Sequence, residues 1–176
     1  MSILNRFSLL KRNALVTGAG QGIGRSLAFA LAEAGANVAV VDRNGDTAKQ
    51  TAQEISALGV ESIAIETDVT QTDQVNHMVD QVTSKWGTLD IAVNNAGIAI
   101  RSPAENIPDE EWDAVLNVNL KAVYLCSRAE GQTMLNQKSG SIINLVSMSG
   151  QIANRPQLHA HYNASKGGAL QLTRSC

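Results

Sequence analysis

Two side chains near the C-terminal end of the sequence have the spacing and chemistry of a proton-transfer pair. Tyr162 and Lys166 are four residues apart, which places them on the same face of a helix. A free phenol has a pKa of about 10, too high for an efficient base at neutral pH. A neighbouring ammonium group favours the phenolate and lowers that pKa. Most isolated Tyr/Lys pairs are surface features, but this one follows a predicted strand whose end carries serines, which favours a catalytic role.

A glycine-rich stretch near the N-terminus has the composition of a phosphate-binding turn. Residues 17–24 read Thr-Gly-Ala-Gly-Gln-Gly-Ile-Gly and lie between a predicted strand and a predicted helix. Glycines allow a sharp turn and a close approach of the backbone to a pyrophosphate, and the helix N-terminus behind them offers unpaired N–H groups. An ordinary tight turn is the simpler interpretation of such a string. The flanking elements, and an acidic residue at the end of the next strand, favour a dinucleotide-binding turn.

That acidic residue is Asp42, which follows the predicted strand 37–41. A carboxylate at this position accepts hydrogen bonds from the ribose hydroxyls of adenosine and repels a 2′-phosphate. The sequence therefore predicts NAD rather than NADP as the cofactor. Arg43 follows directly and is the argument against this choice, because a guanidinium group pairs well with a phosphate.

Short apolar runs alternate with longer amphipathic segments along the chain. We predict strands over 14–17, 37–41, 60–66, 89–93 and 141–146. The predicted helices cover 23–34, 46–58, 70–86 and 108–137, and a last helix begins near Tyr162. Apolar strands separated by helices indicate a parallel sheet with helices on both faces. Right-handed crossovers make a doubly wound, Rossmann-type α/β fold the simplest topology, in a single NAD(P)-binding domain over residues 1–176.

The motifs, in this order and at these strand ends, resemble those of the short-chain dehydrogenase/reductase family over nearly the whole chain. The glycine turn matches the family's T-G-x-x-x-G-x-G, residues 94–97 match its N-N-A-G, and residues 162–166 match its Y-x-x-x-K. Asp68 and Val69 match its D-V pair, which in the family lies near the adenine. The cofactor-binding residues that the resemblance implies are Thr17, Gly18, Gln21, Gly22, Ile23, Gly24, Asp42, Asp68, Val69, Asn95, Ala96, Gly97, Tyr162 and Lys166.

The resemblance also implies catalytic roles for Asn119, Ser147, Tyr162 and Lys166. Tyr162 would exchange a proton with the substrate hydroxyl, Lys166 would hold the nicotinamide ribose, and Ser147 would hold the substrate oxygen. Asn119, in its N-L-K context, corresponds to the family asparagine that holds a water beside the lysine. A buried amide at a helix kink is the alternative interpretation of Asn119.

Two serines compete for the role of substrate-oxygen ligand. Ser147 stands three residues before Gly150, which is the family's pattern at the end of the fifth strand. Ser149 is thirteen residues before the tyrosine, which is the family's commoner spacing. Alignment of the predicted strand 141–146 favours Ser147 and puts two extra residues into the following loop. Ser149 is then a candidate residue of the substrate pocket.

The loop between the fifth strand and the last helix carries the substrate clues. Its segment 154–157, Asn-Arg-Pro-Gln, is similar to loops in polyol and sugar-alcohol dehydrogenases of the family. Polar side chains that would suit a polyhydroxy substrate are Ser149, Asn154, Gln157 and His159. The predicted reaction is hydride transfer between NAD and the CH–OH group of a secondary alcohol, most simply a polyol or sugar alcohol, or the matching ketone.

Composition narrows the class of protein further. Hydrophobic residues make up 44% and charged residues 17%, as in globular proteins, and the net charge of −2 gives no basic surface for nucleic acid or membranes. No apolar run has the length of a membrane span. The two cysteines form no disulfide or zinc pattern, so we expect a soluble, cytoplasmic protein without a metal. His159 and His161 are interpreted as a surface pair.

The chain ends about four helical turns after Tyr162. The resemblance implies further strands and a substrate-covering loop beyond that point, so we expect a fold that lacks its last strands and has an exposed strand edge. In a full-length form we expect a homo-oligomer, either a dimer or a tetramer. Two functions are consistent with this sequence: an NAD-dependent dehydrogenase, and a truncated, non-catalytic protein for NAD binding or subunit association. The presence of all the catalytic residue types favours the first.

Overall fold

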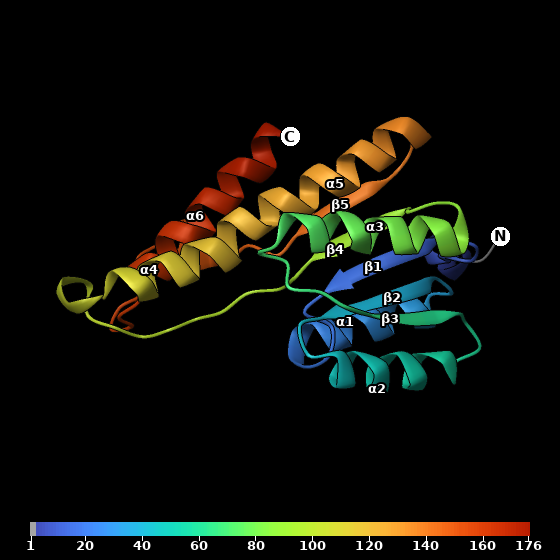
Figure 1. Ribbon diagram of the computed structural model, residues 1–176, viewed down its shortest axis with the longest axis horizontal. Helices are drawn as coiled ribbons and strands as arrows, with labels where there is room; N and C mark the ends of the chain where they lie inside the picture. The colour runs from blue at the N-terminus through green and yellow to red at the C-terminus, as the bar shows by residue number, and fades with distance from the viewer. Residues whose placement is uncertain (1–2) are drawn as a thin grey trace.

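A five-stranded parallel sheet with the order β3-β2-β1-β4-β5 forms the centre of the computed structural model, which describes residues 3–176 (Figure 1). The strands are β1 (Asn13–Thr17), β2 (Asn37–Asp42), β3 (Ser62–Glu66), β4 (Ile91–Asn94) and β5 (Ser141–Asn144). The α-helices are α1 (Gly22–Glu33), α2 (Gly45–Ser56), α3 (Thr72–Trp86), α4 (Asp109–Leu116), α5 (Ala122–Gln137) and α6 (Ala160–Ser175). Short 3-10 helices are η1 (Ile3–Phe7), η2 (Ala104–Asn106) and η4 (Met148–Gly150), and η3 (Asn117–Lys121) is a π-helical turn. The predicted Rossmann-type, doubly wound α/β fold is confirmed.

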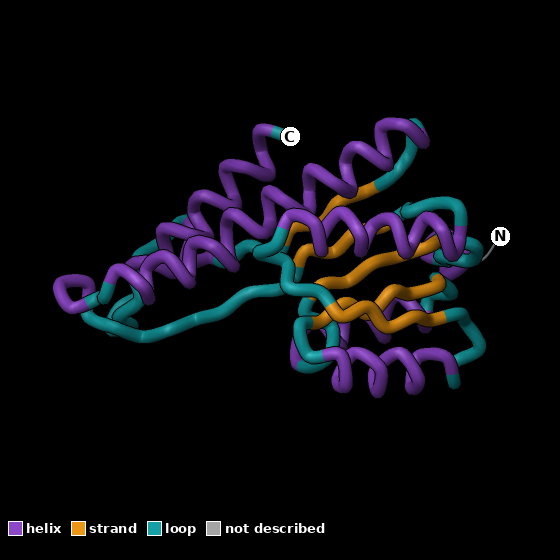
Figure 2. Tube along the Cα trace, in the orientation of Figure 1, coloured by secondary structure: helices purple, strands orange, loops and turns teal. Residues whose placement is uncertain are grey.

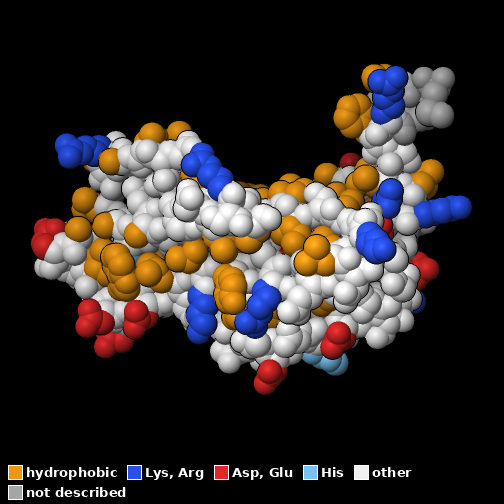
Figure 3. Space-filling model, turned by 90° about the horizontal axis from the view of Figure 1, so that it is seen from above, with side chains coloured by type: hydrophobic (Ala, Val, Ile, Leu, Met, Phe, Trp, Pro, Cys, Tyr) orange, Lys and Arg blue, Asp and Glu red, His pale blue; other side chains and the backbone are white. Residues whose placement is uncertain are grey.

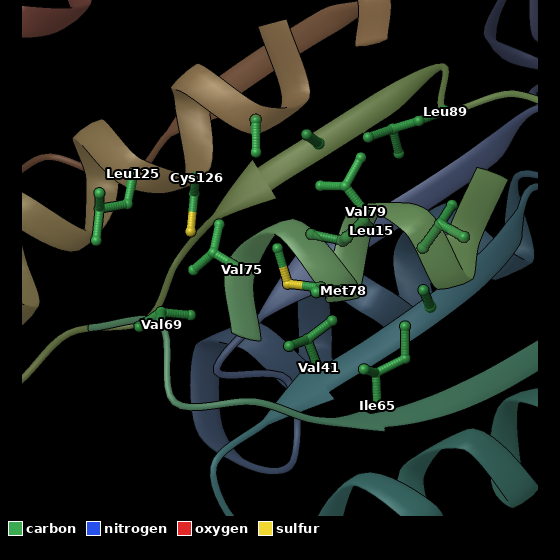
Figure 4. Packing of buried hydrophobic residues seen from close by; sticks show 14 of the residues in the cluster. Leu15, Val41, Ile65, Val69, Val75, Met78, Val79, Leu89, Leu125 and Cys126 are labelled. Atoms are coloured by element: carbon green, nitrogen blue, oxygen red, sulfur yellow. The ribbon is translucent and has the colours of Figure 1, made fainter. Parts of the chain in front are cut away.

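The central strands are buried on both faces, because successive side chains of a strand point to opposite sides of the sheet. Leu15 and Val41 face α3 and α5, where Met78 and Cys126 belong to the same buried cluster (Figure 4). Val16 and its neighbours on the opposite face pack against α1 and α2. Full burial of one such aliphatic side chain stabilises the fold by roughly 1.5–3 kcal/mol. The sheet and its helices therefore form a rigid base for the strand ends.

The predicted helix over 108–137 differs from the structure in one respect. The π-helical turn η3 divides it into α4 and α5. A π turn adds a residue to one turn of an α-helix and is frequent at functional sites. Asn119 lies in this turn and is fully buried. Residues 117–121 contain neither glycine nor proline, so no local signal in the sequence predicts the irregular turn.

The carboxyl ends of the strands lie together at one edge of the sheet, where the longest loops begin (Figure 2). The loop after β4 runs outward to η2 and lies beside the loop before α6. The two loops are joined where Ser102 N–H donates to the Leu158 carbonyl oxygen at 2.9 Å, next to a parallel bridge between Ser102 and His159. Among residues 3–176, no helix combines the length and the apolar character that a membrane crossing requires.

Candidate active site

A cleft of about 460 Å³ opens at the carboxyl edge of the sheet. The predicted site residues in its wall are Gly18, Gln21, Ile23, Gly24, Asp42, Asp68, Val69, Asn95, Ala96, Gly97, Tyr162 and Lys166. The predicted residues outside this wall are Thr17, Gly22, Asn119 and Ser147. The strand order reverses between β1 and β4, and a crevice at such a switch point is where open parallel sheets bind ligands.

The glycine turn after β1 packs directly against the end of β4. A β-carbon at Gly24 would collide with the carbonyl oxygen of Gly18 and with Nδ2 of Asn95. Asn95 Nδ2 donates to the carbonyl oxygens of Thr17, at 2.9 Å, and Gly18, at 3.2 Å. The Thr17 hydroxyl accepts from the N–H groups of Asn95 and Ala96, each at 3.1 Å. Thr17 therefore lies behind the turn and fixes it, and is not itself in the wall of the cleft.

Asp42, at the end of β2, has both carboxylate oxygens held by the backbone. Oδ2 accepts from the Gly20 N–H at 2.9 Å, and Oδ1 accepts from the Asn44 N–H at 3.0 Å. These bonds set the orientation of the negative charge at the edge of the cleft. Arg43 lies beside it in the same wall and is exposed.

The turn after β3 gives the cleft a further wall. Asp68 Oδ1 accepts from both the N–H, at 3.0 Å, and the hydroxyl, at 2.7 Å, of Thr70. Val69 lines the cleft and also belongs to the buried core cluster (Figure 4). Thr67 and Thr70 also line the cleft and were not predicted. Their position directly after a parallel strand is the signal that would have indicated them.

Tyr162 and Lys166 lie on the first turns of α6, with the Lys166 ammonium 5.9 Å from the centre of the Tyr162 ring. Lys166 Nζ donates to the Leu145 carbonyl oxygen at 2.7 Å. Burial lowers the pKa of Lys166, which is only 5% exposed. The edge of the His159 ring contacts Tyr162, with 5.3 Å between the ring centres. The helix thus presents a half-buried phenol and a nearly buried amine to the cleft.

The turn that carries the two candidate serines packs on the same helix. The Ser147 hydroxyl accepts from the Ser149 N–H at 3.1 Å, which caps η4. A β-carbon at Gly150 would lie 2.7 Å from the Lys166 carbonyl oxygen, so only glycine allows this close approach. Ser147 is half-buried at the end of β5, whereas Ser149 is buried with 7% exposure. Ser147 is therefore the more exposed of the two serines, and neither of them lines the cleft.

Three hydrogen bonds fix the side-chain amide of Asn119 within η3. Its Oδ1 accepts from the Ile98 N–H at 2.8 Å, and its Nδ2 donates to the Ile98 carbonyl oxygen at 2.8 Å and to the Ser165 hydroxyl at 3.2 Å. A β-carbon at Gly97 would lie 3.2 Å from Asn119 Oδ1 and 3.7 Å from Lys166 Nζ. The amide and the ammonium group therefore flank Gly97, behind the N-N-A-G segment.

The interpretation of His159 and His161 as a surface pair is wrong for His161. His161 is fully buried, and its Nε2 lies 3.2 Å from Oε1 of Glu111 on α4. This partner lies 50 positions earlier in the sequence, so no local pattern indicates it. His159 is half-buried; burial, together with His161 and Arg101, lowers its pKa. Within residues 3–176, no three His, Cys, Asp or Glu side chains are grouped so that they could hold a metal ion.

Comparison with known proteins assigns this arrangement to a family. Residues 12–176 match the family described as short chain dehydrogenase. The chain belongs to the short-chain dehydrogenase family. It is similar to a 3-oxoacyl-[acyl-carrier-protein] reductase of Staphylococcus epidermidis, with 44% identity over 94% of this chain and 68% of that protein. It is also similar to a galactitol 2-dehydrogenase of Rhizobium johnstonii, with 40% identity over 99% of this chain and 68% of that protein.

Solved structures of short-chain dehydrogenases share the fold closely. A short-chain type dehydrogenase/reductase from Mycobacterium marinum is 43% identical, with a TM-score of 0.96 over 99% of this chain and 71% of that one. A gluconate 5-dehydrogenase from Burkholderia cenocepacia, in complex with NADP and tartrate, is 37% identical, with a TM-score of 0.93 over 99% of this chain and 68% of that one. As a member of this family, the chain is an oxidoreductase that uses a nicotinamide cofactor.

Proposed function

We propose that the chain is the catalytic part of an NAD-dependent dehydrogenase that acts on a secondary alcohol, most simply a polyol or sugar alcohol. The observation that carries this proposal is the meeting of Tyr162 and Lys166 with the glycine turn and Asp42 around one cleft. The alternative is a non-catalytic protein that binds cofactor or associates with other subunits. The position of Tyr162 and Lys166 in the same wall as the glycine turn and Asp42 favours the enzyme.

The residues of the cleft fit a dinucleotide. The close packing at Gly24 brings the backbone of the turn and the start of α1 to the cleft wall, as a pyrophosphate site requires. When bound, the cofactor supplies the hydride chemistry. The chain contributes binding and proton transfer: Tyr162 exchanges the proton of the substrate oxygen, Ser147 orients that oxygen, and Lys166 holds the nicotinamide ribose. Asn119 positions Lys166 through the segment around Gly97.

NAD is the proposed cofactor because backbone hydrogen bonds fix the Asp42 carboxylate at the cleft edge, where it would meet the adenosine ribose of a bound dinucleotide. Arg43 and the NADP-containing relative support the opposite preference. We expect fluorescence titration to give tighter binding of NADH than of NADPH. In Asp42→Ala, NADH should bind about tenfold more weakly, because about 1.4 kcal/mol of charge-assisted hydrogen bonding is lost. Tighter binding of NADPH by the unaltered chain would contradict this preference.

A polyol is the proposed substrate because the loop 154–157 is polar and offers an unsatisfied group. Asn154 Oδ1 is buried without a hydrogen-bond partner among the described residues. Gln157, three positions later in the same loop, is exposed. The similarity to galactitol 2-dehydrogenase supports this choice. The higher identity to 3-oxoacyl-[acyl-carrier-protein] reductase supports a second candidate, reduction of a 3-oxoacyl thioester. NADH formation from polyols, against NADPH consumption with a 3-oxoacyl thioester, separates the two.

The Tyr162→Phe variant tests whether the site is catalytic. Loss of the general acid–base should lower turnover by about 10²–10⁴-fold, while NADH binding stays within about twofold. Tyr124→Phe is the matched control, because Tyr124 is an exposed tyrosine on α5, and its turnover should be unchanged. Full turnover by Tyr162→Phe would contradict the assigned proton donor. NADH binding without turnover of any secondary alcohol would favour the non-catalytic alternative.

Self-association is proposed from the exposed hydrophobic surface. Hydrophobic side chains form several patches across the face seen in Figure 3. The large exposed residues of α4, α5 and β5 are Trp112, Tyr124, Leu135 and Ile143. An apolar surface of this kind is typical of an interface between subunits. We propose a second copy of the chain as the partner, and sedimentation velocity at increasing concentration should show a dimer or a larger species.

A further inference from the structure

One acidic residue, Glu130 on α5, is fully buried and belongs to none of the ion pairs of the described residues. Its exposed fraction is 0%. Its one hydrogen bond comes from Asn94 Nδ2, which donates to Glu130 Oε2 at 2.9 Å. Isolated buried carboxylates are costly and usually become neutral instead. The surroundings of Glu130 therefore favour the carboxylic acid over the carboxylate.

The unsatisfied atoms around this bond indicate where the proton lies. Glu130 Oε1 and Asn94 Oδ1 are both buried, and both lack a hydrogen-bond partner among the described residues. An ionised carboxylate and an amide oxygen are both acceptors, so neither can satisfy the other. A proton on Glu130 Oε1 would turn it into a donor for Asn94 Oδ1. The acid and the amide would then form two parallel hydrogen bonds, with no buried polar atom left over in the pair.

We propose that Glu130 is a protonated carboxylic acid in the folded protein, paired with Asn94, and that it acts as a positioning residue for the strand ends that form the cleft. This proposal goes beyond the function proposed above and does not depend on the substrate or on the preference for NAD.

The pair is connected to the cleft through the residues that follow it. Asn94 Nδ2 also donates to Asn144 Oδ1 at 2.9 Å, which joins the ends of β4 and β5. Asn144 Nδ2 donates in turn to the Thr173 hydroxyl on α6 at 3.1 Å. The next residue after Asn94 is Asn95, which holds the glycine turn, and the next after Asn144 is Leu145, whose carbonyl oxygen accepts from the catalytic lysine. A shift of either asparagine would move these contacts.

The groups that face Glu130 from the packed elements are nearly all neutral. Asn94 of β4, Asn144 of β5 and Thr173 of α6 form the hydrogen-bonded chain that leads away from Glu130, and they do not titrate. On α3, which also packs against α5, the titratable side chains are all exposed: Asp73, His77, Asp80 and Lys85. On α5 itself, Cys126 lies one turn earlier, and burial, with a smaller contribution from Glu130, raises the pKa of this thiol well above its usual value. Glu130 is therefore the one group of this cluster that is expected to titrate near neutral pH.

The direction of the pH effect follows from burial, which raises the pKa of Glu130 from 4.5 to about 7. Below pH 4.5 the carboxyl group is protonated in the folded and the unfolded chain, and its contribution to stability is complete. As the pH rises toward 7, the unfolded chain loses the proton more readily than the folded chain, and stability falls. Above about 7 the folded chain loses the proton too, and the hydrogen bond to Asn94 Oδ1 is lost.

Infrared spectroscopy tests the protonation directly. The full chain at pH 5.5 should show the carbonyl stretch of a buried carboxylic acid, and the band should disappear as the pH is raised to 9. Glu130→Gln should lack the band at every pH, whereas Glu33→Gln, which alters an exposed carboxylate, should keep it. Absence of the band in the unaltered chain at pH 5.5 would overturn the proposal. Its persistence in Glu130→Gln would do so as well.

The positioning role is tested by cofactor titration across the same pH range. Gln can form both bonds of the pair without a titrating proton, so Glu130→Gln should bind NADH with an affinity that changes less than twofold between pH 6 and 8.5. The unaltered chain and Glu33→Gln should lose at least threefold over that range. Equal pH dependence in all three proteins would overturn the positioning role. A failure of the unaltered chain to bind NADH at any pH would refute the proposed function, and the infrared test would still decide the state of Glu130.

Discussion

The strand ends that line the cleft and the loop 151–158 differ in how firmly their side chains are held. On the cofactor side, Asp42, Asn95 and Thr17 each form at least two hydrogen bonds to backbone groups of neighbouring strand ends. In the loop 151–158, where we propose that the substrate binds, no side chain forms a hydrogen bond to another described residue, and nearly all of the segment is exposed. Strand-end residues are therefore fixed by the sheet, whereas loop residues are not.

This difference indicates that the strand ends and the loop 151–158 serve different functions. Segments with few buried contacts open and rearrange at low cost in free energy, and ligand-binding loops are typical of them. The cofactor wall is arranged before any ligand binds, so substitutions there should change stability and cofactor binding together. Substitutions in the loop should change substrate recognition with little effect on stability. Three substitutions test this comparison.

Gly24→Ala should have the largest effect. The new β-carbon would collide with the backbone of the glycine turn and with Asn95. We expect a loss of about 3 kcal/mol or more in the free energy of unfolding, because the turn and α1 must move apart. NADH affinity should fall more than tenfold, as measured by fluorescence titration.

Gly131→Ala is the control for that substitution. Gly131 lies inside α5, and its β-carbon would meet only Ile142, at an ordinary 3.9 Å. Alanine is favoured over glycine in a helix by about 1 kcal/mol, so this variant should be slightly more stable and should bind NADH normally. Equal behaviour of the two variants would show that the glycine turn is no more tightly packed than the helix.

His161→Leu should have an intermediate effect. The substitution removes the imidazole that lies 3.2 Å from Glu111 Oε1, a buried oxygen with no hydrogen-bond partner among the described residues. We expect a loss of about 1–3 kcal/mol in urea unfolding, together with lower turnover, because His161 adjoins Tyr162. His77→Leu, at an exposed position on α3, should change stability by less than about 0.5 kcal/mol. A stable His161→Leu variant would mean that the contact with Glu111 does not fix α6.

Gln157→Ala should have the smallest effect on stability and a clear effect on KM. Its exposed side chain has no hydrogen-bond partner among the described residues, so the free energy of unfolding should change by less than about 0.5 kcal/mol. If it contacts a polyol, KM should rise by about two- to tenfold, which corresponds to one neutral hydrogen bond. Gln132→Ala, on the exposed side of α5, should change neither quantity. An unchanged KM in Gln157→Ala would remove this residue from the substrate pocket.

Most residues of the cofactor-binding wall of the cleft could be predicted from the sequence. Its signals are local: an apolar strand, a glycine turn, a helix, and a carboxylate at the end of the next strand. Because parallel strands end at the same edge of a sheet, the topology alone brings Gly18, Asp42, Asp68 and Asn95 together. The helical spacing of Tyr162 and Lys166 likewise needs no tertiary information.

Contacts between segments that are distant in sequence could not be predicted and are known only from the structure. The π-helical turn around Asn119 has no marker in residues 117–121, because it depends on hydrogen bonds to Ile98 in another loop. His161 lies against Glu111 of α4, and Glu130 is hydrogen-bonded to Asn94 of β4. Burial and a single distant partner set the energy of a polar side chain, and neither can be read from its neighbours in sequence.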